Sequence, residues 1–141
     1  MTLAINHFGH FLLTYLLFEI LKQSIEARII NVSSLIHYRS PDEILEDIEC
    51  RDKSFSSYNQ YAISKFWNVL FTQELSRKLS KYPNIKTVCL HPGLVESNFG
   101  TGVSIIKCLT VFCCCIYVNN EVGARSSIFL STEDFKKLRN G

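Results

Sequence analysis

Glycine and proline are scarce in this sequence, with six glycines and three prolines among 141 residues. The one closely spaced pair, Gly100 and Gly102, has no third glycine after it and no strand-like run immediately before it. A dinucleotide-binding turn needs three spaced glycines between a strand and a helix. The sequence therefore contains no such turn, and we interpret Gly100 and Gly102 as part of an ordinary loop.

The chain also lacks a stretch dominated by charge of one sign that could bind nucleic acid. Its 15 basic and 13 acidic residues give a net charge of +2, and the basic residues are scattered among the acids. Binding to the phosphate backbone needs a basic stripe or patch. Nucleic acid is therefore not an implied partner.

No pattern typical of a metal site is present. The four histidines are scattered among different elements, and we interpret His91 as structural. The acidic residues between positions 35 and 60 lack the glycine turn of a calcium-binding loop, so we expect a solvated excursion. The cysteines lack zinc-like paired spacing, which indicates reduced, mostly buried thiols and a reducing compartment. These six cysteines are Cys50, Cys89, Cys108, Cys113, Cys114 and Cys115.

Two apolar stretches qualify as candidate membrane segments. Residues Leu3–Leu21 lack a basic leader and a cleavage-site pattern, so we predict a buried helix rather than a signal peptide. Residues Val103–Val118 include Lys107 and are short for a span of about 20 residues. Contact of this second stretch with a membrane surface stays open.

Two runs predict parallel strands on either side of a helix. Residues Ala27–Ser34 are rich in β-branched residues and end in two serines. Residues Ile85–Gly93 form a second such run, which stops at a Pro-Gly turn. The alternation of helix and strand predicts a parallel α/β sheet, whose ligands lie beyond the carboxyl ends of the strands. Both serines and the Pro-Gly turn are expected at this edge.

The helix between these strands carries Tyr61 and Lys65, whose spacing places a phenol and an ammonium on one face. A nearby positive charge stabilises a phenolate, so we expect Lys65 to lower the pKa of Tyr61 and to make it an acid/base. Tyr82 and Lys86 have the same spacing, but Pro83 lies between them and an apolar run follows. We expect no helix to align that second pair.

At this point the chain resembles the short-chain dehydrogenase/reductase family, in its retinol-dehydrogenase-like and WW-domain-oxidoreductase-like branch. Four ordered motifs carry the resemblance, and together they are specific where one alone is weak. They are Ile5–Thr14, similar to "VNHLGHFLLT"; Asn31–Ser34, similar to "NVSS"; Tyr61–Lys65, similar to "YxxSK"; and His91–Ser97, similar to "HPGxVxT".

The resemblance implies a catalytic tetrad of Asn6, Ser34, Tyr61 and Lys65. Tyr61 would exchange the proton, Ser34 would orient the substrate oxygen, and Lys65 would also hold the nicotinamide ribose. Asn6 would hold a water that relays protons from Lys65. An alternative makes Ser34 a strand cap and Ser33 the ligand. Besides Tyr61 and Lys65, the implied cofactor-binding residues are Pro92, Gly93, Val95 and Ser97.

The resemblance further implies that residues 1–141 are one partial NAD(P)-binding Rossmann-like domain, a doubly wound parallel α/β sheet truncated at both ends. The N-terminal Gly-rich half and the last strand would be missing. With 47% hydrophobic residues and a mean hydropathy of +0.10, we expect much apolar surface to be left uncovered. We also expect the chain alone to bind dinucleotide only weakly.

The function implied is an NAD(P)-dependent oxidoreductase that acts on an apolar alcohol or carbonyl, such as a retinoid, steroid or lipid aldehyde. The residues that choose between NAD and NADP lie in the half that is lacking. The alternative is a non-catalytic fragment that binds a full-length relative through the helices of Asn6 and Tyr61. The resemblance also implies a homo-oligomer in the full-length form, a substrate lid at Val103–Val118, and a location in the cytoplasm or on the cytosolic face of an intracellular membrane.

Overall fold

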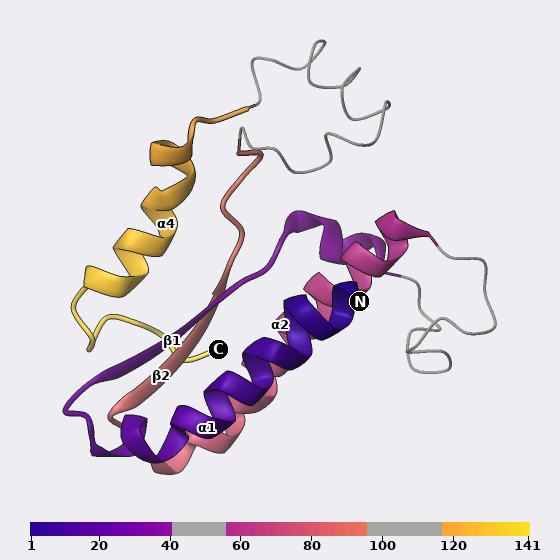
Figure 1. The fold of residues 1–141 in the computed structure, drawn as a ribbon. Helices are drawn as coiled ribbons and strands as arrows, with labels where there is room; N and C mark the ends of the chain where they lie inside the picture. The colour runs from indigo at the N-terminus through magenta and orange to yellow at the C-terminus, as the bar shows by residue number, and fades with distance from the viewer. Residues whose placement is uncertain (41–55, 96–116) are drawn as a thin grey trace.

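The computed structural model describes residues 1–40, 56–95 and 117–141. Within them two strands are flanked by helices (Figure 1). The helices α1 and α2 cover one side of the strand pair, and α4 lies on the other side. In chain order the elements are the π-helix η1 (Ala4–Phe8), α1 (Gly9–Gln23), β1 (Ala27–Val32), the 3₁₀-helix η2 (Leu35–Arg39), α2 (Ser57–Lys78), the 3₁₀-helix η3 (Leu79–Lys81), β2 (Ile85–Leu90) and α4 (Asn120–Thr132).

The two predicted strands pair in parallel, as the sequence pattern indicates. Ala27 lies opposite Ile85 and Val32 lies opposite Leu90, so the carboxyl ends of β1 and β2 reach the same edge. Helix α2 connects the strands, because parallel neighbours need a crossover rather than a tight turn. The predicted α/β class is confirmed, and helices on both sides of the strands give the doubly wound arrangement.

Two small apolar clusters hold the helices on the sheet. Near the start of both strands, Ala27, Leu79 and Ile85 are buried together. At the other end of α2, Leu3 and Ile63 form a second cluster, against which Phe66 and Trp67 pack. This second cluster fixes η1 beside the part of α2 that carries Tyr61.

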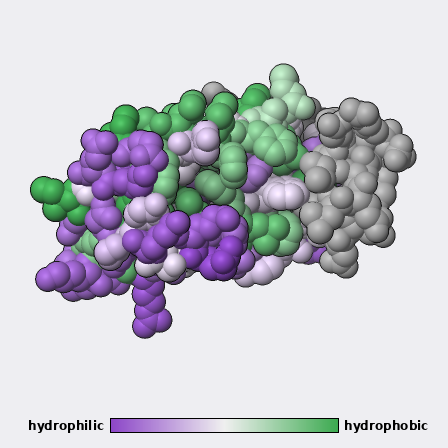
Figure 2. Space-filling view, turned by 90° about the horizontal axis from the view of Figure 1, so that it is seen from below, coloured by the Kyte–Doolittle hydropathy of each residue, from purple (hydrophilic) through white to green (hydrophobic). Residues whose placement is uncertain are grey.

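Most of the N-terminal apolar stretch is exposed, which corrects the expectation of a buried helix. Figure 2 shows broad apolar areas on one face of the molecule. In the described part of the chain, one helix, Ala4–Gln23, is long and apolar enough to cross a membrane, and little of it is buried. Large apolar side chains at least 41% exposed along it are Ile5, Phe8, Phe11, Leu12, Leu13, Tyr15, Leu16, Leu17 and Ile20.

The residues after β2 are tied to the start of α4. Gly93 has a φ of +89°, a conformation that favours glycine. The Val118 N–H donates to the Leu94 carbonyl at 2.8 Å, beside a bridge between Val95 and Val118. The Asn119 side chain then caps α4. The Pro-Gly loop and the N-terminus of α4 therefore form one unit.

Gly123 lets α4 approach this loop closely, so we expect Gly123→Ala to destabilise the fold. On an open helix face this change would stabilise by up to about 1 kcal/mol. Here the added Cβ would lie 3.0 Å from Val95 Cγ1 and 3.3 Å from its Cβ, and nearer still to Cγ2. Overpacking typically costs about 1–3 kcal/mol. Thermal unfolding measures the change, with the exposed Ser126→Ala as control; a rise in Tm for Gly123→Ala would contradict the close packing.

The residues after α4 run along the outer edge of β2. The Gly141 N–H donates to the Thr87 carbonyl at 2.9 Å, and the Thr87 N–H donates to Asn140 Oδ1 at 2.8 Å. Lys86 Nζ donates to the carbonyls of Phe135 and Leu138. These bonds satisfy part of the edge at which a further strand would pair.

Candidate active site

Two serines follow β1, and the structure gives them different environments. Ser33 is buried, and its hydroxyl donates to the Lys65 carbonyl at 2.7 Å. Ser34 is half-buried and extended, and its Oγ accepts from the Ile36 N–H at 3.3 Å, which caps η2. The Ser34 side chain also lies near enough to the Tyr61 hydroxyl to lower the pKa of Tyr61. Ser33 therefore anchors α2, whereas Ser34 both caps η2 and faces the phenol.

Tyr61 and Lys65 lie one turn apart on α2, as their spacing predicts. The helix starts where the Ser56 side chain caps it by accepting from the Asn59 N–H. Lys65 Nζ lies 5.6 Å from the centroid of the Tyr61 ring and donates to the Val32 carbonyl at 3.0 Å. The carboxyl end of β1 thus brings together Ser34, Tyr61 and Lys65. The second pair, Tyr82 and Lys86, shares no helix, so that prediction is confirmed.

The electrostatics of Tyr61 correct the predicted effect of Lys65. The pKa of Tyr61 is raised from its usual value of 10.0, because burial disfavours the phenolate, and the nearby Ser34 side chain offsets only part of this. Burial also lowers the pKa of Lys65. The ammonium is directed at the Val32 carbonyl and the ring face, where it does not outweigh the desolvation of the hydroxyl. Tyr61 is therefore a protonated phenol at neutral pH.

Asn6 lies in the π-helix η1 and contacts α2. Its Nδ2 donates to Ser64 Oγ at 3.1 Å, and Ser64 Oγ donates in turn to the Tyr61 carbonyl at 2.8 Å. Isolated π-turns are rare and occur often at functional sites. Asn6 thus meets the helix one residue before Lys65. Its role in holding a water stays a prediction.

The predicted cofactor loop starts at the same edge of the sheet. Pro92, Gly93 and Val95 follow β2, whose end lies beside that of β1. Ser97 lies outside the described residues, as do Gly100, Gly102 and all of the predicted lid at Val103–Val118 except its last two residues. His91, interpreted from the sequence as structural, is exposed directly after β2.

Comparison with known proteins identifies the relatives of this chain. No family model matches it. Over its whole length it is 35% identical to human retinol dehydrogenase 11, of which it covers 43%. It is 39% identical to human retinol dehydrogenase 14 over 94% of the chain and 40% of that protein. A chloroplastic short-chain dehydrogenase, TIC 32 A of Brassica napus, is 35% identical over 91% of the chain and 42% of that protein.

The chain belongs to the short-chain dehydrogenase/reductase family. Its fold agrees: a crystal structure of an uncharacterised protein from Mycobacterium paratuberculosis superposes with a TM-score of 0.69 at 29% identity. That match covers 98% of this chain and 42% of the other. The chain spans less than half the length of these relatives. The chain therefore corresponds to one part of a short-chain dehydrogenase. Figure 1 shows the strand pair of that part.

Short-chain dehydrogenases use NAD(P), and the residues of this edge fit the nicotinamide ribose end of such a cofactor. An ammonium carries three donors, and the Val32 carbonyl takes one from Lys65. The Tyr61 hydroxyl lies on the same helix face, and Gly93 places no side chain over the edge. Tyr61, Lys65 and the loop after β2 could thus hold ribose hydroxyls and a nicotinamide. The sequence contains no glycine turn for the pyrophosphate.

Sequence reasoning missed several polar residues that support the site. Asn68 and Thr72, both on α2, are at most 2% exposed. The Thr72 hydroxyl donates to the Asn68 carbonyl at 2.8 Å and accepts from Asn31 Nδ2 at 2.9 Å. Cys89 on β2 lies near Thr72 and Ser33, and burial raises the pKa of its thiol. The sequence offered one signal for these residues. The face of α2 that packs on the sheet carries polar side chains where apolar ones are usual.

Metal ligands and cysteines give no further site in the part of the chain that the structure describes. There, no three His, Cys, Asp or Glu side chains lie close enough to hold a metal. Cys89 is a free thiol. The other five cysteines lie outside the described residues. So do the acidic residues at positions 42–52, which are Asp42, Glu43, Glu46, Asp47, Glu49 and Asp52.

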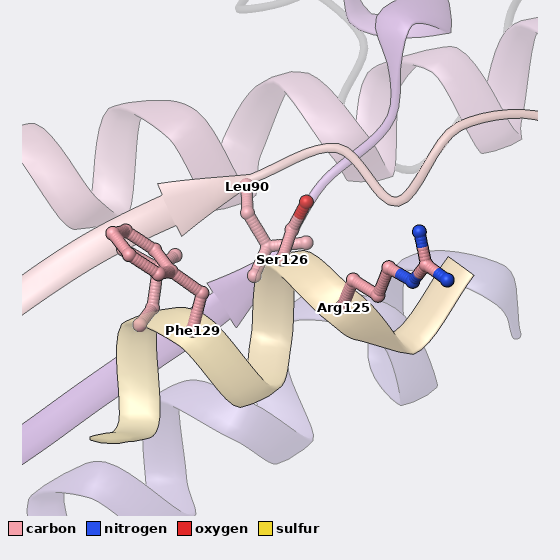
Figure 3. Close-up of a pocket in the computed structure, with 5 residues that line it drawn as sticks. Leu90, Arg125, Ser126 and Phe129 are labelled. Carbon is pink, nitrogen blue, oxygen red and sulfur yellow. The ribbon is translucent and has the colours of Figure 1, made fainter. Parts of the chain in front are cut away.

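An open pocket of about 420 Å³ lies between β2 and α4 (Figure 3), on the side of the strands opposite α2. Leu90, Arg125, Ser126, Phe129 and Leu130 line it. Figure 3 shows the Arg125 side chain pointing away from Leu90 and Phe129. Among the described residues that line this pocket only Arg125 and Ser126 are polar, and they do not form a convergent set, so we assign the pocket no ligand.

We expect the fold to lose stability as the pH falls below about 6.5, because of His7. This residue is 5% exposed, and burial lowers its pKa from 6.5. As the pH falls through 6.5 the unfolded chain takes up a proton before the folded chain does, so stability is full above this pH and decreases toward the lower folded pKa. Denaturant unfolding followed by Trp67 fluorescence, which reports beside His7, measures this.

The exposed His10, three residues later at the start of α1, provides the control. We expect His10→Gln to keep nearly the same pH dependence, whereas His7→Asn removes the titrating group and flattens it. Equal slopes in the two variants would show that another group causes the effect.

Proposed function

We propose that this chain carries the proton-transfer site of an NAD(P)-dependent oxidoreductase of the short-chain type. The observation that carries the proposal is the convergence of Ser34, Tyr61 and Lys65 at the carboxyl end of β1, where Lys65 lies over the Tyr61 ring and bonds to the Val32 carbonyl, and Ser34 follows two residues later. Acid/base catalysis requires a proton donor fixed beside a group that binds the substrate oxygen. These three residues offer that arrangement.

The proposed mechanism assigns one task to each side chain. Tyr61 donates its proton to the substrate oxygen when a carbonyl is reduced and takes one back when an alcohol is oxidised. Ser34 hydrogen-bonds that oxygen and orients it. Lys65 stabilises the phenolate that forms when the proton leaves. Hydride supply or acceptance is the chemistry that a dinucleotide held by Tyr61, Lys65 and the loop after β2 would contribute. The raised pKa of Tyr61 keeps the proton on the phenol, which is the form that reduction of a carbonyl needs.

We further propose an apolar alcohol or carbonyl as substrate, of the retinoid, steroid or lipid aldehyde class. Exposed apolar side chains lie close in sequence to the proposed site, with Leu35 60% and Tyr38 77% exposed on η2 and Leu94 48% exposed after β2. Apolar walls with few polar groups are typical of sites for such ligands. The names of the retinol dehydrogenases among its relatives support the same class.

For the whole protein we propose that NAD or NADP is the cofactor, that the protein forms a homo-oligomer, and that it works in the cytoplasm or on the cytosolic face of an intracellular membrane. The exposed apolar helix of residues 4–23 supports contact with a membrane or a second subunit. The proposed membrane contact at Val103–Val118 lies outside the described residues except for its last two positions.

A chimera tests the proposed function. This chain would replace the segment of human retinol dehydrogenase 11 that it matches over its whole length. We expect the purified chimera to oxidise an apolar primary alcohol or reduce its aldehyde with NAD(H) or NADP(H), followed by nicotinamide absorbance. A folded chimera that binds the dinucleotide but shows no turnover above buffer would contradict the assignment.

The exposed apolar face of α1 favours a second candidate, a non-catalytic fragment that pairs with a full-length relative. Side chains such as Leu12, Leu16 and Ile20 recur every four residues and are more than half exposed. A partner helix could cover them. Co-purification with human retinol dehydrogenase 14, combined with an inactive chimera, would favour this candidate over the enzyme.

A further inference from the structure

The carbonyl of Val32, the last residue of β1, receives two side-chain donors. Lys65 Nζ donates at 3.0 Å and Asn68 Nδ2 at 3.4 Å. The N–H groups of Ala27 and Ser33 donate to carbonyls of the β2 side. In a parallel strand alternate residues face opposite edges, so Val32 presents its carbonyl away from β2. This carbonyl is the protein group that anchors the Lys65 ammonium.

The contacts of Asn68 fix which way its amide points. A carbonyl only accepts hydrogen bonds, so the NH₂ group of Asn68 must face Val32. The amide oxygen then faces His7, whose Nδ1 lies 3.2 Å from Asn68 Oδ1. His7 Nδ1 must therefore carry a hydrogen. Since burial disfavours the charged ring, the neutral tautomer with the proton on Nδ1 satisfies this pair.

Packing holds the His7 ring in place. It lies 5.3 Å from the Phe8 ring, 5.5 Å from Trp67 and 6.0 Å from Phe71, measured between centroids. His7 is 5% and Asn68 2% exposed, so water does not compete freely for their hydrogen bonds. A rigid polar connection therefore runs from η1 through Asn68 to the carbonyl that anchors Lys65.

We propose that Asn68 and His7 are positioning residues that hold the Val32 carbonyl so that Lys65 stays beside Tyr61. The proposal rests on the proposed function only for the role of Lys65. Asn68 fixes the direction of the carbonyl, and His7 fixes the amide of Asn68. Neither residue needs to touch substrate or cofactor.

Competitive acetylation of the lysines tests this proposal without any measurement of catalysis. The full chain is treated with a trace of acetic anhydride in dilute solution, and mass spectrometry gives the relative rate at each lysine. Lys65 should react slowly in the wild type, because its amine is half-buried and bonded to Val32. Lys86 is a matched reference, since its amine is bonded to the carbonyls of Phe135 and Leu138.

We expect Asn68→Leu to raise the rate of acetylation at Lys65 about fivefold, which is the factor that corresponds to the net free energy of one hydrogen bond. The rate at Lys86 should not change. The control Gln73→Leu, on the exposed side of the same helix, should change neither rate. An equal rise at Lys65 and Lys86 would mean a general loss of structure and would overturn the proposal. An unchanged rate at Lys65 would overturn it as well.

Two substitutions of His7 separate its hydrogen bond from its packing. His7→Phe keeps an aromatic ring but removes the donor, so we expect faster acetylation of Lys65. His7→Asn removes the ring but places an amide nitrogen at the position of Nδ1, and should keep Lys65 protected. The reverse order would show that the ring and not the hydrogen bond matters. Loss of activity in the chimera with all these rates as expected would count against the proposed function alone.

Discussion

Tyr61→Phe is expected to lower kcat of the chimera at least about a hundredfold, while dinucleotide binding stays nearly intact. The substitution removes only the hydroxyl that we propose transfers the proton. The ring and its packing against Lys65 stay in place. Steady-state kinetics give kcat, and calorimetric titration with NADH and NADPH gives the binding affinity.

Tyr58→Phe is the matched control, because Tyr58 lies on the same helix nearly one turn earlier and is 52% exposed. It should leave kcat unchanged. Lys65→Ala should damage both turnover and dinucleotide binding, because one ammonium serves both. If Tyr61→Phe keeps more than about a tenth of the wild-type kcat, Tyr61 is not the general acid.

The second large effect is expected in the oligomeric state of the chain by itself. The face of η1 and α1 exposes a long apolar surface, including Phe8, Leu12 and Leu16. Each Å² of apolar surface removed from water contributes about 25 cal/mol, so a face of several hundred Å² favours association by many kcal/mol. Light scattering after size-exclusion chromatography in reducing buffer should therefore give a mass well above the 16.2 kDa monomer.

Substitutions within this face locate the contact. Leu16→Gln replaces a side chain that is 64% exposed near the middle of α1 and should shift the population toward the monomer. Ile25→Gln is the control, because Ile25 is 94% exposed but lies in the turn after the helix. A cooperatively melting wild-type monomer of 16.2 kDa would show that the exposed face needs no partner.

The sequence was sufficient for the elements whose signals are local. The β-branched runs predicted both strands, and parallel pairing placed Ser34 and the loop after Leu90 at one edge. The spacing of Tyr61 and Lys65 predicted a shared helix face, and Pro83 correctly separated Tyr82 from Lys86. Each of these inferences depends on neighbours within a few residues or on the fixed direction of parallel strands.

What the sequence did not predict depends on contacts between distant segments. His7 and Asn68 are 61 residues apart, and their hydrogen bond can be recognised only once η1 is known to lie on α2. The sign of the Tyr61 pKa shift was wrong, because charge spacing says nothing about burial. The π-helix that contains Asn6 was also not predicted, because nothing in the local sequence distinguishes it from an α-helix.

The bridge between Val95 and Val118 couples the loop after β2 to helix α4. The chain leaves the sheet at Val95, and Val118 lies beside it, one residue before the Asn119 cap of α4. Gly123, in the first turn of the same helix, packs closely against Val95. A substitution that displaces Val95 is therefore expected to shift the start of α4 together with the loop that carries Gly93.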